Sequence, residues 1–189
     1  IMRQMGVDIK CGIEIGKDIT IQQLRDQGYK AFYVAIGAQG GRKTGVAGED
    51  AQGVQTGVDF LRKINLDNSV RLEGDTVVVG GGNVAVDVAR TAIRSGASKV
   101  TMLCLESAEE MPAAKDEVAE TKEEGIDVKN SWGPKEILTE DGHVTGIVFK
   151  RCVQVKDADG RFNPQYDEND TITIPCKNVL LSIGQSIEW

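Results

Sequence analysis

Several features are absent from this sequence, and each absence narrows the class of protein. No apolar run approaches the roughly 18 residues that a membrane-spanning helix needs, so we expect no membrane partner. Basic residues are fewer than acidic ones. The chain has 22 Lys and Arg and 29 Asp and Glu, which gives a formal net charge of −7. Nucleic acids and anionic membranes select basic surfaces. The composition therefore predicts neither as a partner.

Residues that commonly bind metals are scarce. None of the four cysteines has C-x-x-C or other ligand spacing; they are Cys11, Cys104, Cys152 and Cys176. Free thiols in a reducing cytoplasm are the simpler interpretation, and a metal or redox pair is the alternative. The one histidine, His143, follows Asp141-Gly142 in a predicted hairpin turn, which indicates a surface residue. We expect a cytoplasmic protein without a metal site.

The catalytic pair of a short-chain dehydrogenase is also missing. That class needs a tyrosine followed four residues later by lysine. Here Tyr29, Tyr33 and Tyr166 are followed at that distance by Tyr33, Gly37 and Asp170. An independent dehydrogenase of this type is therefore excluded.

What the sequence does contain is a glycine turn between a strand and a helix, VVVGGGNVAVDVARTAIRSG at 77–96. Gly80 can leave the strand sharply, and Gly82 has no Cβ to hold the backbone away from a phosphate. Ala85 lets the helix pack close to the sheet. The amides at the helix start, from Asn83 onward, direct unpaired N–H groups and the positive end of the helix dipole at an anion. This pattern predicts a site for a dinucleotide pyrophosphate.

The surroundings of the turn support this interpretation over a purely structural turn. Residues 76–79 are typical of a buried parallel strand, and a second strand is predicted at 99–105. Apolar residues between them recur at helical spacing, and Glu106 follows the second strand. The candidate cofactor-binding residues are Gly80, Gly81, Gly82, Asn83, Val84, Ala85, Leu105, Glu106, Ile183 and Gly184. No catalytic side chain is expected among them.

Alternating strand and helix patterns predict an α/β fold with a Rossmann-like parallel sheet. Strands are expected at 7–11 and 31–36, with helices at 19–27, 56–64 and 113–124 and a third parallel strand at 126–128. Short alternating runs at 144–149, 152–155 and 171–174 predict an antiparallel β-meander insertion. A last apolar strand, 179–183, would rejoin the parallel sheet and place Gly184 at its carboxyl edge, where ligands bind.

The motifs resemble one family closely. GGGNVAVD at 80–87, EMPA at 110–113, EEG at 123–125 and SIGQ at 182–185 are similar to the pyridine-nucleotide domain of the glutamate synthase small-subunit family. That family belongs to the FAD-dependent pyridine nucleotide-disulfide oxidoreductases. The resemblance covers essentially the whole chain but only the middle of the family's protein, so we expect an excised fragment. Residues 1–54 would be a remnant of the flavin-domain flank and connection, and 55–189 the NAD(P)H-binding domain.

The resemblance implies hydride transfer from NAD(P)H to FAD, with FAD present only in the full-length protein. The family's flavin fingerprint and iron–sulfur cysteines lie outside this sequence. The implied partners are the missing flavin domain and an iron–sulfur or acceptor subunit. The fragment alone would bind nucleotide without turnover. A standalone NAD(P)-sensing or binding module without catalysis is the alternative.

The residues after the second strand indicate which nucleotide is preferred. The family usually carries arginines there for the 2′-phosphate of NADPH, but the corresponding residues are Cys104, Leu105, Glu106 and Ala108. An acid at this point accepts hydrogen bonds from the ribose hydroxyls of NAD and repels a phosphate. We therefore favour NADH, unless Arg90, Arg94 or Lys115 approaches the site. The simpler alternative is that Glu106 is solvated or caps the turn near Ser107.

Overall fold

The computed structural model describes residues 1–188, and the chain divides into two compact units, Ile1–Ile36 and the part from Gly37 onward. The first unit contains a 3₁₀ helix η1 (Arg3–Met5) and helix α1 (Ile21–Asp26). Thr20 caps α1 in a reciprocal capping box with Gln23. The strands expected at 7–11 and 31–36 were predicted wrongly. Neither segment pairs with another strand in the described chain, and an unpaired strand is not stable in water.

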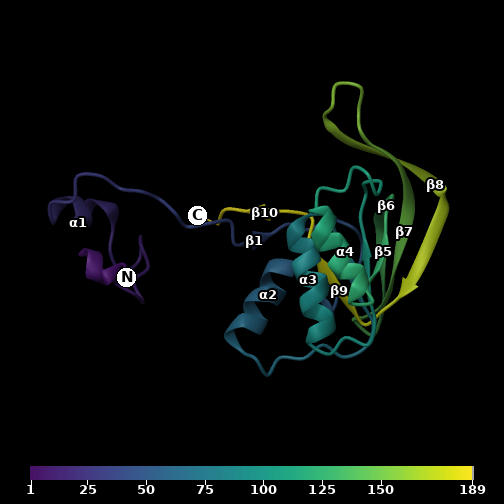
Figure 1. Ribbon diagram of the computed structural model, residues 1–189, viewed down its shortest axis with the longest axis horizontal. Helices are drawn as coiled ribbons and strands as arrows, with labels where there is room; N and C mark the ends of the chain where they lie inside the picture. Colours follow the sequence, from purple (N-terminus) through teal and green to yellow (C-terminus); the bar gives the residue numbers. More distant parts are fainter. Residues whose placement is uncertain (189) are drawn as a thin grey trace. The chain divides into compact units, whose positions relative to one another are not determined.

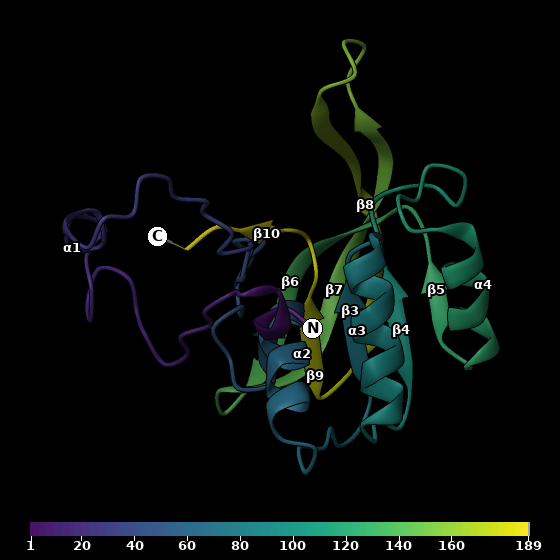
Figure 2. The same ribbon diagram turned by 60° about the vertical axis from the view of Figure 1, so that its left-hand side comes forward.

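The second unit is built in three layers, which Figures 1 and 2 show. Its central sheet has five parallel strands in the order β2 (Val54–Thr56), β9 (Asn178–Leu181), β3 (Thr76–Val79), β4 (Val100–Leu103) and β5 (Asp127–Lys129). The helices are α2 (Gly57–Leu66), α3 (Asn83–Arg94) and α4 (Lys115–Glu123). The antiparallel sheet consists of β6 (Trp132–Glu140), β7 (His143–Lys156) and β8 (Phe162–Pro175). A short antiparallel pair joins β1 (Gly40–Gly41) to β10 (Gln185–Ser186).

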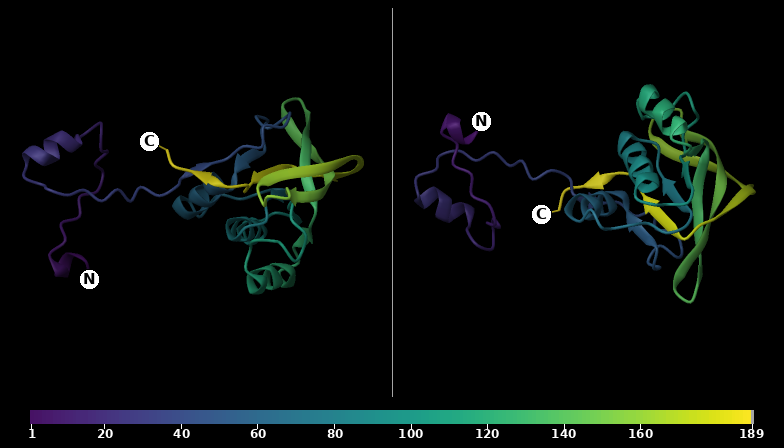
Figure 3. Two further views of the ribbon diagram at one scale, coloured as in Figure 1. Left: turned by 90° about the horizontal axis from the view of Figure 1, so that it is seen from above. Right: turned by 60° about the horizontal axis from the view of Figure 1, so that its bottom comes forward.

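Alternation along the parallel strands explains the layers, which the right-hand view of Figure 3 shows with the helices and the antiparallel strands on opposite sides. Successive side chains of a strand point to opposite faces. Val78, Met102 and Leu180 pack in one core with the helices, whereas Val77 and Val179 pack in a second core with the antiparallel sheet. Both faces of the parallel sheet are therefore buried, as its continuous apolar runs predict.

The α/β fold with a Rossmann-like parallel sheet and an antiparallel insertion is confirmed, and β9 rejoins the parallel sheet as expected. It lies between β3 and β2, and β2 was not predicted. The insertion differs in detail. Its first strand, β6, was not predicted, and β7 and β8 are longer than the three short runs indicated. The polar break at 157–161 is the turn between β7 and β8, whereas residues 168–170 lie within β8 at a register shift of the β7–β8 pairing. None of the helices in residues 1–188 is both long and apolar enough to cross a bilayer.

Candidate functional site

A pocket of about 680 Å³ opens beyond the carboxyl ends of the parallel strands. Nine of the ten candidate residues line it; they are Gly80, Gly81, Gly82, Asn83, Val84, Leu105, Glu106, Ile183 and Gly184. The tenth, Ala85, is fully buried in the core between α3 and the sheet. The topology therefore gathers residues that are up to about a hundred positions apart in the sequence, because parallel strands end at one edge of the sheet.

Two of the three glycines in the turn are required by close contacts. Gly80 has φ +143°, and a Cβ there would lie 2.3 Å from the carbonyl oxygen of Ser182. A Cβ on Gly81 would lie 2.9 Å from Cys104 Cβ and 3.0 Å from Glu106 Oε2. The turn is thus packed against the ends of β9 and β4 on either side.

Gly82 is different, because a Cβ at this position would meet nothing within 4 Å. It is the N-cap of α3, and no side chain caps this helix end. Within the described chain, the backbone N–H groups of Asn83 and Val84 donate to no acceptor. The open space therefore faces unpaired amides at the positive end of a helix dipole, which is the usual setting for a bound phosphate.

Glu106 lies at the wall of the pocket beside this turn. Its side chain is half-buried, the Cys104 thiol donates to its backbone carbonyl at 3.6 Å, and its carboxylate forms no ion pair among the described residues. The neighbouring turn has its own cap, because the Glu110 backbone N–H donates to Ser107 Oγ at 3.3 Å and Ser107 Oγ donates to Glu110 Oε2 at 2.9 Å. Glu106 does not serve as that cap. Its carboxylate is free to accept hydrogen bonds from a ligand.

The pocket also contains a thiol, that of Cys104, which is 2% exposed. Burial, with a smaller contribution from the charge of Glu106, raises the pKa of Cys104 to about 11. The thiol therefore stays protonated near neutral pH and is a poor nucleophile. No group of three His, Cys, Asp or Glu side chains arranged to hold a metal occurs in residues 1–188.

The arginines on α3 do not reach the pocket. Arg90 pairs with Glu120 at 2.8 Å and with Glu124 at 2.7 Å, and Arg94 pairs with Glu124 at 2.5 Å. These ion pairs join α3 to α4. Neither arginine lines the pocket, and Lys115 does not line it either.

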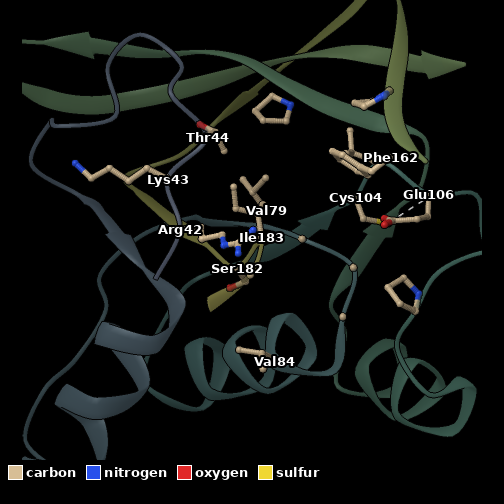
Figure 4. Close-up of a pocket in the computed structure, with 18 of the residues that line it drawn as sticks. Arg42, Lys43, Thr44, Val79, Val84, Cys104, Glu106, Phe162, Ser182 and Ile183 are labelled. Atoms are coloured by element: carbon tan, nitrogen blue, oxygen red, sulfur yellow. Dashed lines mark hydrogen bonds between the residues drawn. The ribbon is translucent and has the colours of Figure 1, made fainter. Parts of the chain in front are cut away.

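Sequence reasoning missed two walls of the pocket, which Figure 4 shows in part. One is the segment from Arg42 to Val46, and the other is aromatic and comes from the antiparallel sheet. Of the two Trp, three Tyr and four Phe in the chain, three line this pocket; they are Trp132, Phe162 and Tyr166. The concentration of rare aromatic residues in the insertion is the feature of the sequence that could have predicted this wall. Cations lie over two of these rings, with Arg151 Cζ 3.8 Å from the centre of the Trp132 ring and Lys150 Nζ 4.2 Å from that of Tyr166.

The whole of this arrangement corresponds to one known family. The model of the pyridine nucleotide-disulphide oxidoreductases matches residues 2–188. The chain belongs to this family. In this chain the oxidoreductase fold has a glycine turn at the carboxyl edge of the parallel sheet. The antiparallel insertion lies on the other side of the pocket at that edge.

Curated oxidoreductases show the same relationship over almost the full chain. The chain is 38% identical over 194 residues to the NADP(+)-dependent formate dehydrogenase subunit beta of Moorella thermoacetica, covering 99% of this chain and 27% of that protein. It is 37% identical to the NADPH-Fe(3+) oxidoreductase subunit beta of Geobacter sulfurreducens, covering 98% and 28%. The glutamate synthase [NADPH] small chain of Halomonas elongata is 34% identical, with 97% and 41% covered. The resemblance to the glutamate synthase small-subunit family is confirmed, and the chain spans less than half the length of these relatives.

Solved structures agree on the fold. FprA from Mycobacterium tuberculosis, solved in complex with NADPH, superposes with a TM-score of 0.77 over 92% of this chain and 54% of that one, at 21% identity. A thioredoxin reductase from Lactococcus lactis gives a TM-score of 0.56 at 20% identity, with 76% and 41% covered. At this identity the likeness establishes the fold of the oxidoreductase domain.

Proposed function

We propose that residues 55–189 form the NAD(P)H-binding domain of an FAD-dependent oxidoreductase that passes hydride from NAD(P)H to FAD. The observation that carries the proposal is the open space at Gly82, which faces unpaired amides at the start of α3. A pocket of about 680 Å³ lies within the range of roughly 300–1,000 Å³ that is typical of cofactor sites. Membership of the pyridine nucleotide-disulphide oxidoreductase family supports the proposal that the ligand is a nicotinamide dinucleotide.

The protein's own residues bind and orient the nucleotide. The α3 amides and the glycine turn would hold the pyrophosphate, and Glu106 the adenosine ribose. Trp132 and Tyr166 line one side of the pocket, where their rings would exclude water from the bound nucleotide. The nicotinamide ring would supply the hydride itself. No side chain in this chain is assigned a catalytic role.

NADH is the nucleotide that the pocket suits better. A half-buried carboxylate without a partner accepts hydrogen bonds from the two ribose hydroxyls, but it repels a 2′-phosphate. The cations of α3 that could offset this repulsion are held in ion pairs with Glu120 and Glu124. The names of the curated relatives specify NADP(H) for those proteins. Glu106 is the reason to assign a different preference here.

The flavin domain is the proposed first partner. Residues 1–54 are assigned to its flank and connection, although Gly40–Gly41 and Val54–Thr56 pair with strands of the second unit. No residue from 1 to 36 is buried, and apolar side chains such as Ile9, Ile15 and Tyr33 are exposed. Such exposure is unusual for a soluble surface and fits a segment that another domain covers. An iron–sulfur or acceptor subunit would take the electrons onward, in the cytoplasm.

Titration calorimetry of the purified chain with NADH and NADPH tests this function. We expect one site per chain, tighter binding of NADH, and no oxidation of NADH by the chain alone, because the flavin is supplied elsewhere. Absence of binding by either nucleotide would overturn the proposal. Binding with a clear preference for NADPH would overturn only the assignment of Glu106.

A further inference from the structure

Arg42 enters the pocket from the wall that sequence reasoning missed. Its backbone N–H donates to the carbonyl oxygen of Gly184 at 3.1 Å. Its side chain crosses the same glycine, with Cδ 3.4 Å from the position that a Cβ on Gly184 would occupy. Figure 4 shows the guanidinium reaching into the pocket in the region of Ser182 and Ile183. Because Gly184 has no side chain, the aliphatic part of the Arg42 side chain has room to pass over it.

The charge of Arg42 has no partner among the described residues. Within residues 1–188 its guanidinium forms neither an ion pair nor a hydrogen bond. The adjacent cation behaves differently, because Lys43 Nζ lies 2.5 Å from Asp50 Oδ1. Arg42 and Lys43 are the two cations among the residues that line the pocket. One of them is neutralised, and the other faces the cavity.

A buried carboxylate holds this segment in place. Glu49 is 8% exposed and accepts hydrogen bonds from the Thr44 backbone N–H at 2.5 Å, from Thr44 Oγ1 at 2.7 Å and from the Gly45 backbone N–H at 2.9 Å. These bonds fix the backbone directly after Arg42. Glu49 forms no ion pair with Arg42 within residues 1–188, so its role is to hold the backbone of the segment.

The position of Arg42 in the pocket indicates which part of a bound dinucleotide its side chain would contact. A Cβ on Gly80 would lie 2.3 Å from the carbonyl oxygen of Ser182, and Arg42 crosses Gly184 two residues later, so the glycine turn and Arg42 border the same part of the pocket. In Figure 4, Arg42 and Glu106 lie toward opposite ends of the pocket. A 2′-phosphate would lie at the ribose that Glu106 contacts, away from Arg42. The pyrophosphate would lie nearer to it.

We propose that Arg42 binds the pyrophosphate of the dinucleotide from the side opposite the α3 amides, and that Glu49 is the positioning residue for Arg42. The proposal rests on the function proposed above and assigns a residue to it. Guanidinium groups suit this role because they donate parallel hydrogen bonds to two phosphate oxygens. The same contact offsets the net negative charge of the protein, which otherwise disfavours an anionic ligand.

Calorimetry of Arg42→Gln with three probes tests the assignment. The Kd values of NADH and ADP-ribose, which share the pyrophosphate, should rise about tenfold, the effect expected of one exposed charge-assisted hydrogen-bonding group. The Kd of AMP, which lacks the pyrophosphate, should rise much less. Arg62→Gln removes the same charge from the exposed face of α2, outside the pocket, and should change none of the three. The Arg42 side chain is exposed, so the variant should fold normally.

Glu49→Gln tests the positioning role, because its amide would present a donor to the Gly45 N–H. This variant should weaken NADH binding, and the double variant with Arg42→Gln should bind no more weakly than Arg42→Gln alone. Unchanged NADH affinity in Arg42→Gln would overturn the assignment, and so would an equal loss of affinity for AMP. Additive losses in the double variant would overturn the role of Glu49. Failure of the unmodified chain to bind any of the probes would refute the proposed function instead.

Discussion

The side chain of Asn83, the first residue of α3, accepts a hydrogen bond at 2.9 Å from the backbone N–H of Ala114. A second bond, from the Ala113 N–H to the carbonyl oxygen of Gly81 at 3.0 Å, runs parallel to it. The two bonds tie the segment before α4 to the glycine turn and bring Pro112 to the pocket. Asn83 therefore shapes the site with its side chain, in addition to offering its backbone amide.

Replacing Asn83 by alanine should loosen this segment. The Ala114 N–H loses its acceptor, at a cost of about 1 kcal/mol in unfolding free energy, and NADH affinity should fall severalfold. Hydrogen exchange measured by NMR should show reduced protection of the Ala114 amide. Asn65→Ala is the matched control, because Asn65 bonds the Leu61 carbonyl on an exposed part of α2. If the Ala114 amide stayed as protected from exchange in Asn83→Ala as in the unmodified chain, the Asn83 side chain would not hold this segment.

Exchanging the charge at Glu106 should reverse the nucleotide preference. In Glu106→Arg, NADH loses a hydrogen-bond acceptor, whereas the 2′-phosphate of NADPH gains a cation. We expect the ratio of the two Kd values to shift by about a hundredfold toward NADPH, since each change contributes roughly 1.4 kcal/mol. Parallel titrations of both nucleotides measure the ratio. Glu106→Gln, which removes charge but keeps an acceptor, should give an intermediate value. An unchanged ratio in Glu106→Arg would show that residue 106 does not contact the ribose.

Two buried thiols should make stability fall at high pH. Burial raises the pKa of Cys104 to about 11 and that of Cys176 to about 12, from 9.0. The unfolded chain loses these protons first, so their contribution is complete below pH 9 and is lost as the pH rises toward 11 and 12. Urea unfolding between pH 8 and 11 measures the slope. The double variant Cys104→Ala, Cys176→Ala should show a shallower decline. If the unfolding free energy fell with pH at the same rate in both proteins, the two thiols would not be the cause of the decline.

Local patterns predicted the parts of the fold whose partners are close in sequence. β3, α3 and β4 follow one another within 30 residues, and Thr76–Val79 was predicted to the residue because its side chains are buried on both faces. Gly184 was placed at the ligand edge for a topological reason, since a last parallel strand ends there.

The remaining differences depend on long-range contacts. β6 carries Trp132 and Pro134, and its identity as a strand depends on pairing with β7, which no local pattern encodes. Arg42 lies in a glycine-rich stretch without periodicity, so its place in the pocket follows from the Glu49 hydrogen bonds and from the contact with Gly184. Conversely, residues 7–11 have the composition of a strand but lack a pairing partner in the described chain.

The space beside Gly82 is proposed to receive the pyrophosphate, and Gly82→Ala is the substitution that tests this assignment. The backbone of Gly82, at φ −91° and ψ 173°, suits alanine, and an added Cβ meets no protein atom within 4 Å. Unfolding free energy should therefore fall by no more than about 1 kcal/mol, the difference between glycine and alanine at an N-cap. Calorimetry with NADH should nevertheless show a loss of affinity of at least about tenfold, because the methyl group occupies the ligand's space. Wild-type affinity for NADH in a stably folded Gly82→Ala protein would contradict the account.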